Sequence, residues 1–141
     1  MSEVDAPAVR TPREVLTCYY QAMLDKSPDD LADLYATDAV HEFPFTSPGF
    51  PSRLEGREAV RAGYRAAWGA SPVQVQEVTR VAAYETADPE VIIAEHVVRG
   101  TLTTKATAFT VPGLLILHVR NGLITRVRDY MDASGIAAAR G

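Results

Sequence analysis

The segment RVRDYMD near the end of the chain carries an aspartate at a position where proton transfer is conceivable. If this segment forms a β-strand, alternation of side chains puts Asp129 on one face with Val127 and Met131, and puts Arg126 and Arg128 on the other. A desolvated carboxylate has a raised pKa and can carry protons near neutral pH. The alternation therefore predicts that Asp129 is a general acid or base rather than a surface charge paired with an arginine.

His96 lies in a second β-rich run, VIIAEHVVRG, on the same strand face as Ala94 and Val98. A single histidine on an apolar face is most often a hydrogen-bonded core residue, and that alternative stays open. A neighbouring carboxylate favours the imidazolium form of histidine, and such a pair could share a proton across the physiological pH range. We therefore predict that His96 assists Asp129 in catalysis.

No pattern in the sequence points to a metal or a cofactor. His41 and His118 lie in other β-rich runs, without the close spacing of helical metal motifs. The chain has no G-x-S-x-G, Walker loop or G-x-G-x-x-G motif, which argues against serine hydrolases and nucleotide or dinucleotide sites. We expect neither a metal nor a cofactor.

Composition narrows the class of protein further. A chain of 141 residues with 47% hydrophobic residues suits one domain with one core. The formal charge of −4 and the lack of Lys or Arg runs argue against a nucleic-acid partner. The longest near-apolar stretch, VPGLLILHV, is too short to span a bilayer, and the acidic opening does not resemble a secretion signal. With Cys18 as the single cysteine, we expect a cytoplasmic protein without a membrane partner.

Helix signals occupy the first half of the chain. In TPRE, Thr11 fits an N-cap and Glu14 completes a capping box, which predicts a helix to about Leu24. SPDD repeats the start signal and predicts a short second helix that extends to Tyr35. The segment REAVRAGYRAAW has apolar residues at helical spacing and predicts a third helix over residues 57–68.

Strand signals dominate the second half. After a first strand, AVHEFPF, and an irregular loop rich in Pro and Gly, RNG marks a tight hairpin. Helices followed by long antiparallel strands predict an α+β fold, whose curved sheet can wrap around the three helices and leave a cavity. We expect a lead-in at 1–10, one domain at 11–133 and a tail at 134–141. The later β-rich runs cover residues 73–85, 91–103, 113–120 and 123–132.

The order of these segments resembles a known family. Two helices, LYATDAVHEFPF, LEGREAVRAGY, strands and NGLITRVRDYMD are similar, over residues 12–133, to the SnoaL-like branch of the nuclear transport factor 2-like superfamily. The resemblance implies a cone-shaped α+β fold of the cystatin-like roll type, with a mixed or antiparallel sheet, a deep apolar pocket and commonly a homodimer. Members include polyketide cyclases, limonene-type epoxide hydrolases, steroid isomerases and proteins that only bind ligands, so the fold does not choose the reaction.

The epoxide-hydrolase comparison carries over only in part. RDYMD is similar to the segment whose first aspartate is the base in those enzymes, and the acid/base aspartate of SnoaL-like cyclases has the same place, so the resemblance assigns this role to Asp129. His96 stands where the epoxide hydrolases have an arginine, and Val98 stands where they have a second aspartate. The triad is therefore incomplete.

The steroid-isomerase comparison also carries over in part. Phe43 occupies the position of the isomerase base, and only the neighbouring Glu42 is acidic. Tyr19 falls where those enzymes have their oxyanion tyrosine. We expect Tyr19 or Glu42 to bind or orient the substrate.

We expect the reaction to be cofactor-independent acid/base proton transfer, a cyclisation or an isomerisation. The substrate would be a small apolar oxygenated metabolite such as a polyketide intermediate. Two alternatives stay open: epoxide hydrolysis or epoxide-opening cyclisation with His96 as the acid, and a dimeric pocket that only binds. Phe43, Phe45 and Phe50 cluster at the end of the first predicted strand and in the loop after it. They are either core anchors of that loop or part of a pocket lid. The further residues expected to line the pocket are Phe43, Phe45, Phe50, Tyr64, Trp68, Val98, Val127 and Met131.

Overall fold

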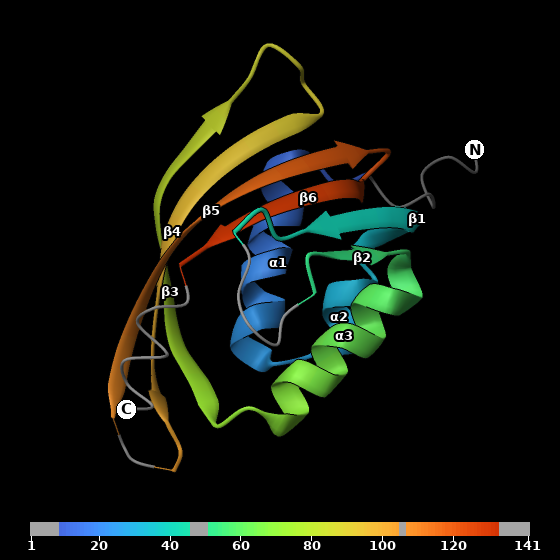
Figure 1. The fold of residues 1–141 in the computed structure, drawn as a ribbon. Coiled ribbons are helices and arrows are strands. Elements are labelled where there is room, and N and C mark those ends of the chain that lie inside the picture. The colour runs from blue at the N-terminus through green and yellow to red at the C-terminus, as the bar shows by residue number, and fades with distance from the viewer. Residues whose placement is uncertain (1–8, 46–50, 105–106, 133–141) are drawn as a thin grey trace, which may run out of the picture.

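The computed structural model describes residues 9–45, 51–104 and 107–132, so most of the expected lead-in and tail lies outside it. Figure 1 shows the helices packed on one side of a long curved sheet. No helix in these ranges is long and apolar enough to cross a membrane. The elements are α1 Pro12–Asp25, α2 Pro28–Ala32, β1 Tyr35–Glu42, β2 Arg53–Glu55, α3 Arg57–Ala70, β3 Val73–Glu85, β4 Val91–Leu102, β5 Ala108–Arg120 and β6 Leu123–Met131.

The sheet has the strand order β2-β1-β6-β5-β4-β3. The strands β3 to β6 form an antiparallel meander, whereas β1 joins it by pairing in parallel with β6. The long strands curve strongly around the helices, and this arrangement confirms the expected α+β fold with a mixed, curved sheet (Figure 1). The parallel pair matters for the site because it brings residues near position 41 beside residues near position 127.

Helix α1 forms as its sequence predicts. The Thr11 hydroxyl accepts a hydrogen bond from the Glu14 backbone, and the Glu14 carboxylate accepts one from the Thr11 backbone, which completes the capping box. The helix ends where Lys26 adopts the left-handed conformation with a φ of 47°. The buried side chains of the helix are Val15, Leu16, Tyr19, Tyr20 and Ala22.

The later strands follow the period of two that their sequences show. In β4 every second side chain is buried, including those of Ala94, His96 and Val98. The hairpin between β5 and β6 turns at Asn121 and Gly122, whose φ values of 53° and 78° are the positive pair that a two-residue turn of this type requires. The RNG hairpin prediction is therefore confirmed.

Two local predictions are wrong. The second helix ends at Ala32, and Tyr35 begins β1 instead of extending the helix. The loop that was expected to be irregular contains the short strand β2, which pairs with β1. Both errors have one cause: Tyr35 pairs with Ile124 and Val40 pairs with Glu55, and partners distant along the chain leave no local signal.

The core consists of two buried clusters on the concave face of the sheet. The larger one lies beneath the helices and contains Leu16, Tyr35, Leu117 and Val127 among others. The smaller one lies where β4 ends and β5 begins, and Met131 packs against it from β6. Polar residues are rare in this interior, since His41, His96 and Asp129 are the buried polar or charged residues of the described ranges. The smaller cluster consists of Val98, Leu102, Phe109 and Val111.

Candidate functional site

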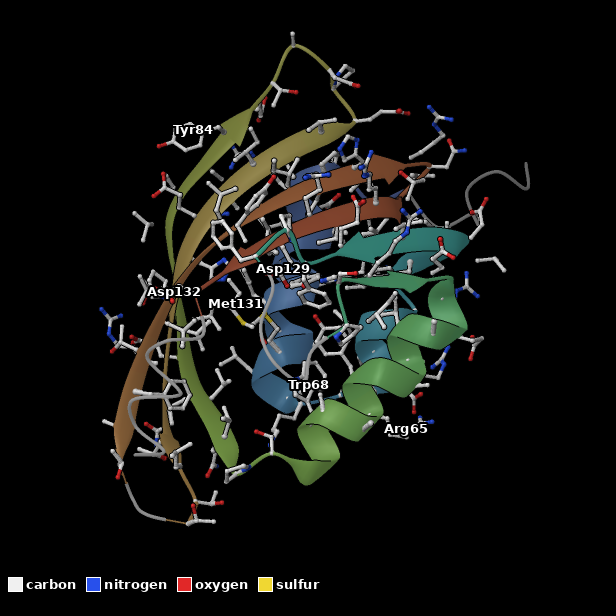
Figure 2. All side chains as sticks on the ribbon, viewed as in Figure 1. Arg65, Trp68, Tyr84, Asp129, Met131 and Asp132 are labelled. Atoms are coloured by element: carbon white, nitrogen blue, oxygen red, sulfur yellow. The ribbon has the colours of Figure 1, made fainter. Side chains whose placement is uncertain are left out.

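Asp129 lies on β6 with its side chain on the concave face, where only 11% of the side chain is exposed. Figure 2 shows Asp129 and Met131 between the sheet and the helices, whereas Tyr84 projects from the opposite face. The neighbouring arginines of β6 point away, because alternation directs positions 126 and 128 to the convex face. The orientation expected from RVRDYMD is thus the one observed.

His41, on β1, is the direct partner of Asp129. In the parallel β1–β6 pair His41 lies opposite Val127, so its ring reaches the next inward residue of β6. His41 Nε2 lies 3.1 Å from Asp129 Oδ2, and His41 Nδ1 lies 2.7 Å from the Tyr35 hydroxyl. The imidazole is fully buried and packs against the Phe43 ring at a centroid distance of 4.6 Å.

The hydrogen-bond network assigns the protons of His41. If the Tyr35 hydroxyl donates to Nδ1, the ring proton resides on Nε2 and is donated to Asp129. This arrangement fixes Asp129 through Oδ2 alone. No described residue donates to the second oxygen, Oδ1. A carboxylate held by one oxygen and free at the other is available to a ligand.

Three tyrosine hydroxyls surround this pair. Tyr19 on α1 influences the pKa values of both Tyr35 and Tyr64, and the Tyr64 hydroxyl lies 3.4 Å from His41 Nε2. Burial raises the pKa of all three phenols well above the ordinary value, and the Asp129 charge adds to the effect. These hydroxyls therefore remain protonated and serve as donors. We call Tyr19, Tyr35, His41, Tyr64 and Asp129 the inner polar cluster.

His96 belongs to a separate contact. Its Nδ1 lies 3.3 Å from the Tyr20 hydroxyl on α1, and the two rings meet edge to face. Burial lowers the pKa of His96, and the Asp129 charge offsets this only in part. Among the described residues the hydrogen-bond partner of Asp129 is His41, so the sharing of a proton between His96 and Asp129 stays a prediction.

Glu42 does not join the inner polar cluster. Since His41 and Phe43 point inward, Glu42 points to the convex face, where Oε1 lies 2.7 Å from Arg126 Nε and 3.2 Å from Arg128 Nη1. The arginine hydrogen bond is the main cause that lowers the pKa of Glu42. The prediction that Glu42 binds or orients substrate beside Asp129 is corrected by this placement.

Several predicted pocket residues do lie near the inner polar cluster. Tyr19 and Tyr64 belong to it, and Trp68 packs against Tyr64 with ring centroids 4.8 Å apart. Val98 and Met131 lie together in the smaller core cluster, on the same face. These side chains would present an aromatic and aliphatic wall to a molecule near Asp129.

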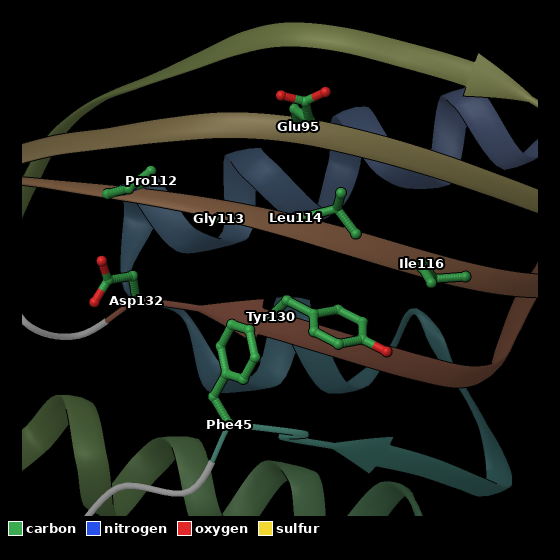
Figure 3. A pocket seen from close by; sticks show the side chains of 8 residues that line it. All are labelled: Phe45, Glu95, Pro112, Gly113, Leu114, Ile116, Tyr130 and Asp132. Atoms are coloured by element: carbon green, nitrogen blue, oxygen red, sulfur yellow. The ribbon is translucent and has the colours of Figure 1, made fainter.

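Other predicted pocket residues lie elsewhere. Phe45 is 59% exposed and packs against Tyr130 on the convex face, where a shallow depression of about 500 Å³ opens. Figure 3 shows this depression with α1 behind the sheet. Alternation along β6 places Tyr130 on the face opposite Asp129. Val127 is fully buried in the main core, and its contact with a ligand stays a prediction. Phe50 lies outside the described residues.

A pocket between the sheet and the helices stays a prediction. A second depression, of about 380 Å³, lies between the start of α1 and the β3–β4 hairpin, so neither of these two depressions opens beside Asp129. The segment predicted as a pocket lid includes residues 46–50, which lie outside the described ranges. Within those ranges, no three side chains of His, Cys, Asp or Glu come together as a metal site.

Sequence reasoning missed three members of these contacts. Tyr35 was placed in a helix, His41 was considered only as a metal ligand, and Tyr20 was not named as a site residue. The alternation in AVHEFPF could have placed His41 inward with Phe43. The partnership with Asp129 needs the parallel pairing of β1 and β6, which joins residues 88 positions apart.

Comparison with protein families identifies the class. The SnoaL-like domain matches residues 16–127, which is most of the chain. A PhzA/B-like protein of Pseudomonas aeruginosa, PA3332, is 35% identical over 100 residues, which span 71% of this chain and 69% of that protein. The chain therefore belongs to the SnoaL-like family.

Solved structures place the fold. A crystal structure named "Putative Isomerase from Bacillus subtilis" superimposes with a TM-score of 0.82 at 27% identity, covering 92% of this chain and 91% of that one. A Catenulispora acidiphila protein with a ketosteroid isomerase-like fold, solved with trimethylamine, gives a TM-score of 0.73 at 28% identity over 92% and 93% of the two chains. The protein has the ketosteroid isomerase-like fold of the nuclear transport factor 2-like superfamily.

Proposed function

We propose that this protein is a cofactor-independent enzyme that transfers a proton to and from a carbon atom beside a carbonyl group. The observation that carries the proposal is the hydrogen bonding of Asp129, whose Oδ2 is held by His41 while Oδ1 receives no donor from the described residues. An oriented carboxylate with one free oxygen on a mainly apolar face is suited to general acid/base catalysis.

The proposed reaction balances as a proton transfer. Asp129 Oδ1 takes a proton from the substrate carbon, the electron pair of that C–H bond moves into a new carbon–carbon double bond, and charge develops on the carbonyl oxygen. The protonated Asp129 then returns the proton to the same carbon, to another carbon or after ring closure. His41 holds the carboxylate in position throughout, since Tyr35 fixes its ring.

The substrate would be a small apolar molecule that carries oxygen, such as a polyketide intermediate. Trp68 packs against Tyr64 of the inner polar cluster, and Met131, on the same face of β6 as Asp129, packs with Val98. These side chains would supply apolar contacts to the substrate, and the Tyr19 and Tyr64 hydroxyls would supply donors. The family also supports a small organic ligand. The Bacillus subtilis structure that resembles this chain is named as an isomerase, which is consistent with proton transfer.

Solvent exchange tests this proposal without the natural substrate. 2-Tetralone is an apolar ketone with acidic C–H groups, and NMR first establishes that it binds. We expect the wild-type protein to accelerate deuterium uptake from D₂O, and Asp129→Asn to lower the rate by about 10²–10⁴-fold, because the amide accepts no proton. Binding of the ketone and thermal stability should change little.

The matched control is Glu95→Gln, which alters a carboxylate on the convex face that borders the depression beside Tyr130. This variant should exchange deuterium at the wild-type rate. If Asp129→Asn and wild type exchange bound 2-tetralone equally, Asp129 is not the base. A protein that binds the ketone but never exchanges it would support the alternative of a passive pocket.

Other expectations remain predictions. Epoxide opening would incorporate solvent ¹⁸O into the product, whereas proton transfer would not. A homodimer would appear as twice the chain mass in sedimentation, and the cytoplasmic location would require localisation in cells. The oligomeric state and the location do not bear on the proton chemistry proposed for Asp129, whereas incorporation of solvent ¹⁸O would contradict it.

A further inference from the structure

His96 combines three features that its role as a core residue does not explain. It is buried, it reaches a hydrogen-bond partner through Nδ1 only, and it faces a glycine on the next strand. No described residue hydrogen-bonds with Nε2. The ring is thus fixed at one nitrogen and free at the other, which parallels the state of the Asp129 carboxylate.

The Tyr20 contact is coupled to the tautomer of His96. If the Tyr20 hydroxyl donates to Nδ1, its one partner among the described residues, the phenol proton points at Nδ1. Burial raises the pKa of Tyr20 to about 12, against a smaller opposite effect of Arg80, so the phenol remains a donor. In a neutral ring whose Nδ1 accepts, the proton resides on Nε2. His96 therefore offers an Nε2–H donor.

Gly113 makes room for this donor. His96 pairs with Gly113 across β4 and β5, and Gly113 pairs with Met131 across β5 and β6. A Cβ added at Gly113 would lie only 2.7 Å from His96 Nε2, so any other residue would displace the ring. The absent side chain lets the Nε2 edge of His96 extend over β5 toward β6, which carries Asp129 and Met131.

His96 also lies at the border between polar and apolar surroundings. His96, Gly113 and Met131 lie side by side across β4, β5 and β6. Leu115 and Asp129 lie side by side two positions further along β5 and β6, on the same face. On the other side of His96 lies the smaller core cluster with Val98 and Val111. A cyclic ketone whose apolar ring rests on this cluster would direct its carbonyl oxygen toward His96 and the adjacent C–H group toward Asp129.

We propose that His96 is a neutral hydrogen-bond donor that binds the carbonyl oxygen of the substrate through Nε2–H and stabilises the enolate formed there. The inference rests on the proposed proton transfer by Asp129 and narrows its substrate class to apolar, enolisable ketones. In this proposal His96 does not share a proton with Asp129. His96 keeps its own proton throughout the reaction and only donates a hydrogen bond. A preoriented donor directed at developing charge stabilises the transition state.

The first test concerns the free protein. With ¹⁵N-labelled histidine, NMR at pH 7 should show His96 as a neutral ring protonated at Nε2. Tyr20→Phe removes the phenol proton and should raise the population protonated at Nδ1. An imidazolium at pH 7, or a ring protonated at Nδ1 in the wild type, would overturn the inference whatever Asp129 does.

The second test uses 2-naphthol, a planar oxygen-bearing mimic of the enol of 2-tetralone. We expect naphthol to shift the His96 Nε2–H resonance, and His96→Leu to lower deuterium exchange into 2-tetralone by about 10²-fold. His96→Gln keeps an N–H donor and should retain more activity than His96→Leu. Failure of naphthol to bind the wild type, or equal exchange in His96→Leu and wild type, overturns the inference.

Gly113→Ala provides a variant that leaves His96 itself unchanged. The added methyl group should displace the ring and lower naphthol affinity, whereas Gly69→Ala, whose added methyl meets no atom within 4 Å, should not.

The proposed roles of Asp129 and His96 can fail separately. Loss of exchange in Asp129→Asn with no effect of His96→Leu removes only the donor role. Normal exchange in Asp129→Asn together with a His96–naphthol contact removes only the base.

Discussion

Glu42 and Asp129 are two carboxylates on neighbouring strands that point to opposite faces of one sheet. Glu42 receives hydrogen bonds from Arg126 and Arg128 on the convex face. Asp129 receives one from His41 on the concave face, where no described arginine or lysine pairs with it. The side of the sheet, and not the residue type or the distance along the chain, decides which carboxylate is neutralised and which is available to react.

The surroundings of each carboxylate follow from the same alternation. Along β6, Arg126 and Arg128 share the convex face with Glu42 of β1, while Asp129 and Val127 share the concave face with His41. Arginines that hydrogen-bond a carboxylate hold it ionised and make it a poor proton acceptor. The following predictions test this contrast, starting with the largest expected effect.

Removal of His41 should be the most damaging change to the fold. His41→Ala leaves a cavity and removes the partner of both Tyr35 and Asp129, so we expect a loss of about 2–5 kcal/mol of unfolding free energy. Urea denaturation measures this loss. His118→Ala, on the half-buried convex side, should lose less than about 1 kcal/mol. Equal losses would mean that the inner polar cluster has no special energetic role.

The tyrosine hydroxyls should differ in their contributions. Tyr35→Phe removes the 2.7 Å contact with His41 Nδ1 and should lower stability by about 1–2 kcal/mol. Tyr64→Phe removes a 3.4 Å contact and should lower stability less. Urea midpoints of the two variants give the comparison, and a larger loss for Tyr64→Phe would contradict the proton assignment of His41.

The two faces should lose stability in different pH windows. The pKa of His96 is lowered in the fold, so its contribution is present above the unfolded value of 6.5 and is lost as pH falls through the folded value. The pKa of Glu42 is also lowered, and its contribution disappears only as pH falls below 4.5. Urea midpoints across pH 8 to 3 should lose the upper window in His96→Gln and the lower window in Glu42→Gln. If the urea midpoint fell over the same pH range in the wild type and in both variants, neither His96 nor Glu42 would cause the loss of stability.

The ion pairs of the convex face should matter least. Arg126→Gln should lower stability by at most about 1 kcal/mol, because exposed pairs are screened by water and salt. Denaturation at about 1 M salt should remove the difference from wild type. A loss that persists at high salt would mean that Arg126 contributes through packing.

The sequence predicted the fold and the inward face of Asp129 because both depend on local patterns. Capping signals start α1, alternation defines β4 and β6, and Asn-Gly forms the last hairpin. The partners of Asp129 were not predicted, because His41 reaches it through a parallel strand pair and Tyr35 was assigned to a helix. Contacts between β1 and β6 depend on strand order, and the alternation of a single strand does not encode strand order.

Glu42 illustrates the same limit from the other direction. Its family position suggested a role beside the substrate, yet the inward placement of His41 and Phe43 turns Glu42 to the convex face. A shift by one residue exchanges the two faces of a strand, so a carboxylate one position away from a family site can have an unrelated role.

Deuterium exchange into 2-tetralone by Asp129→Asn and Glu42→Gln, measured side by side, tests the contrast between the two faces most directly. We expect the first variant to lose about 10²–10⁴-fold in rate and the second to keep the wild-type rate. Equal rates in the two variants, or a greater loss in Glu42→Gln, would contradict the assignment of proton transfer to the concave face.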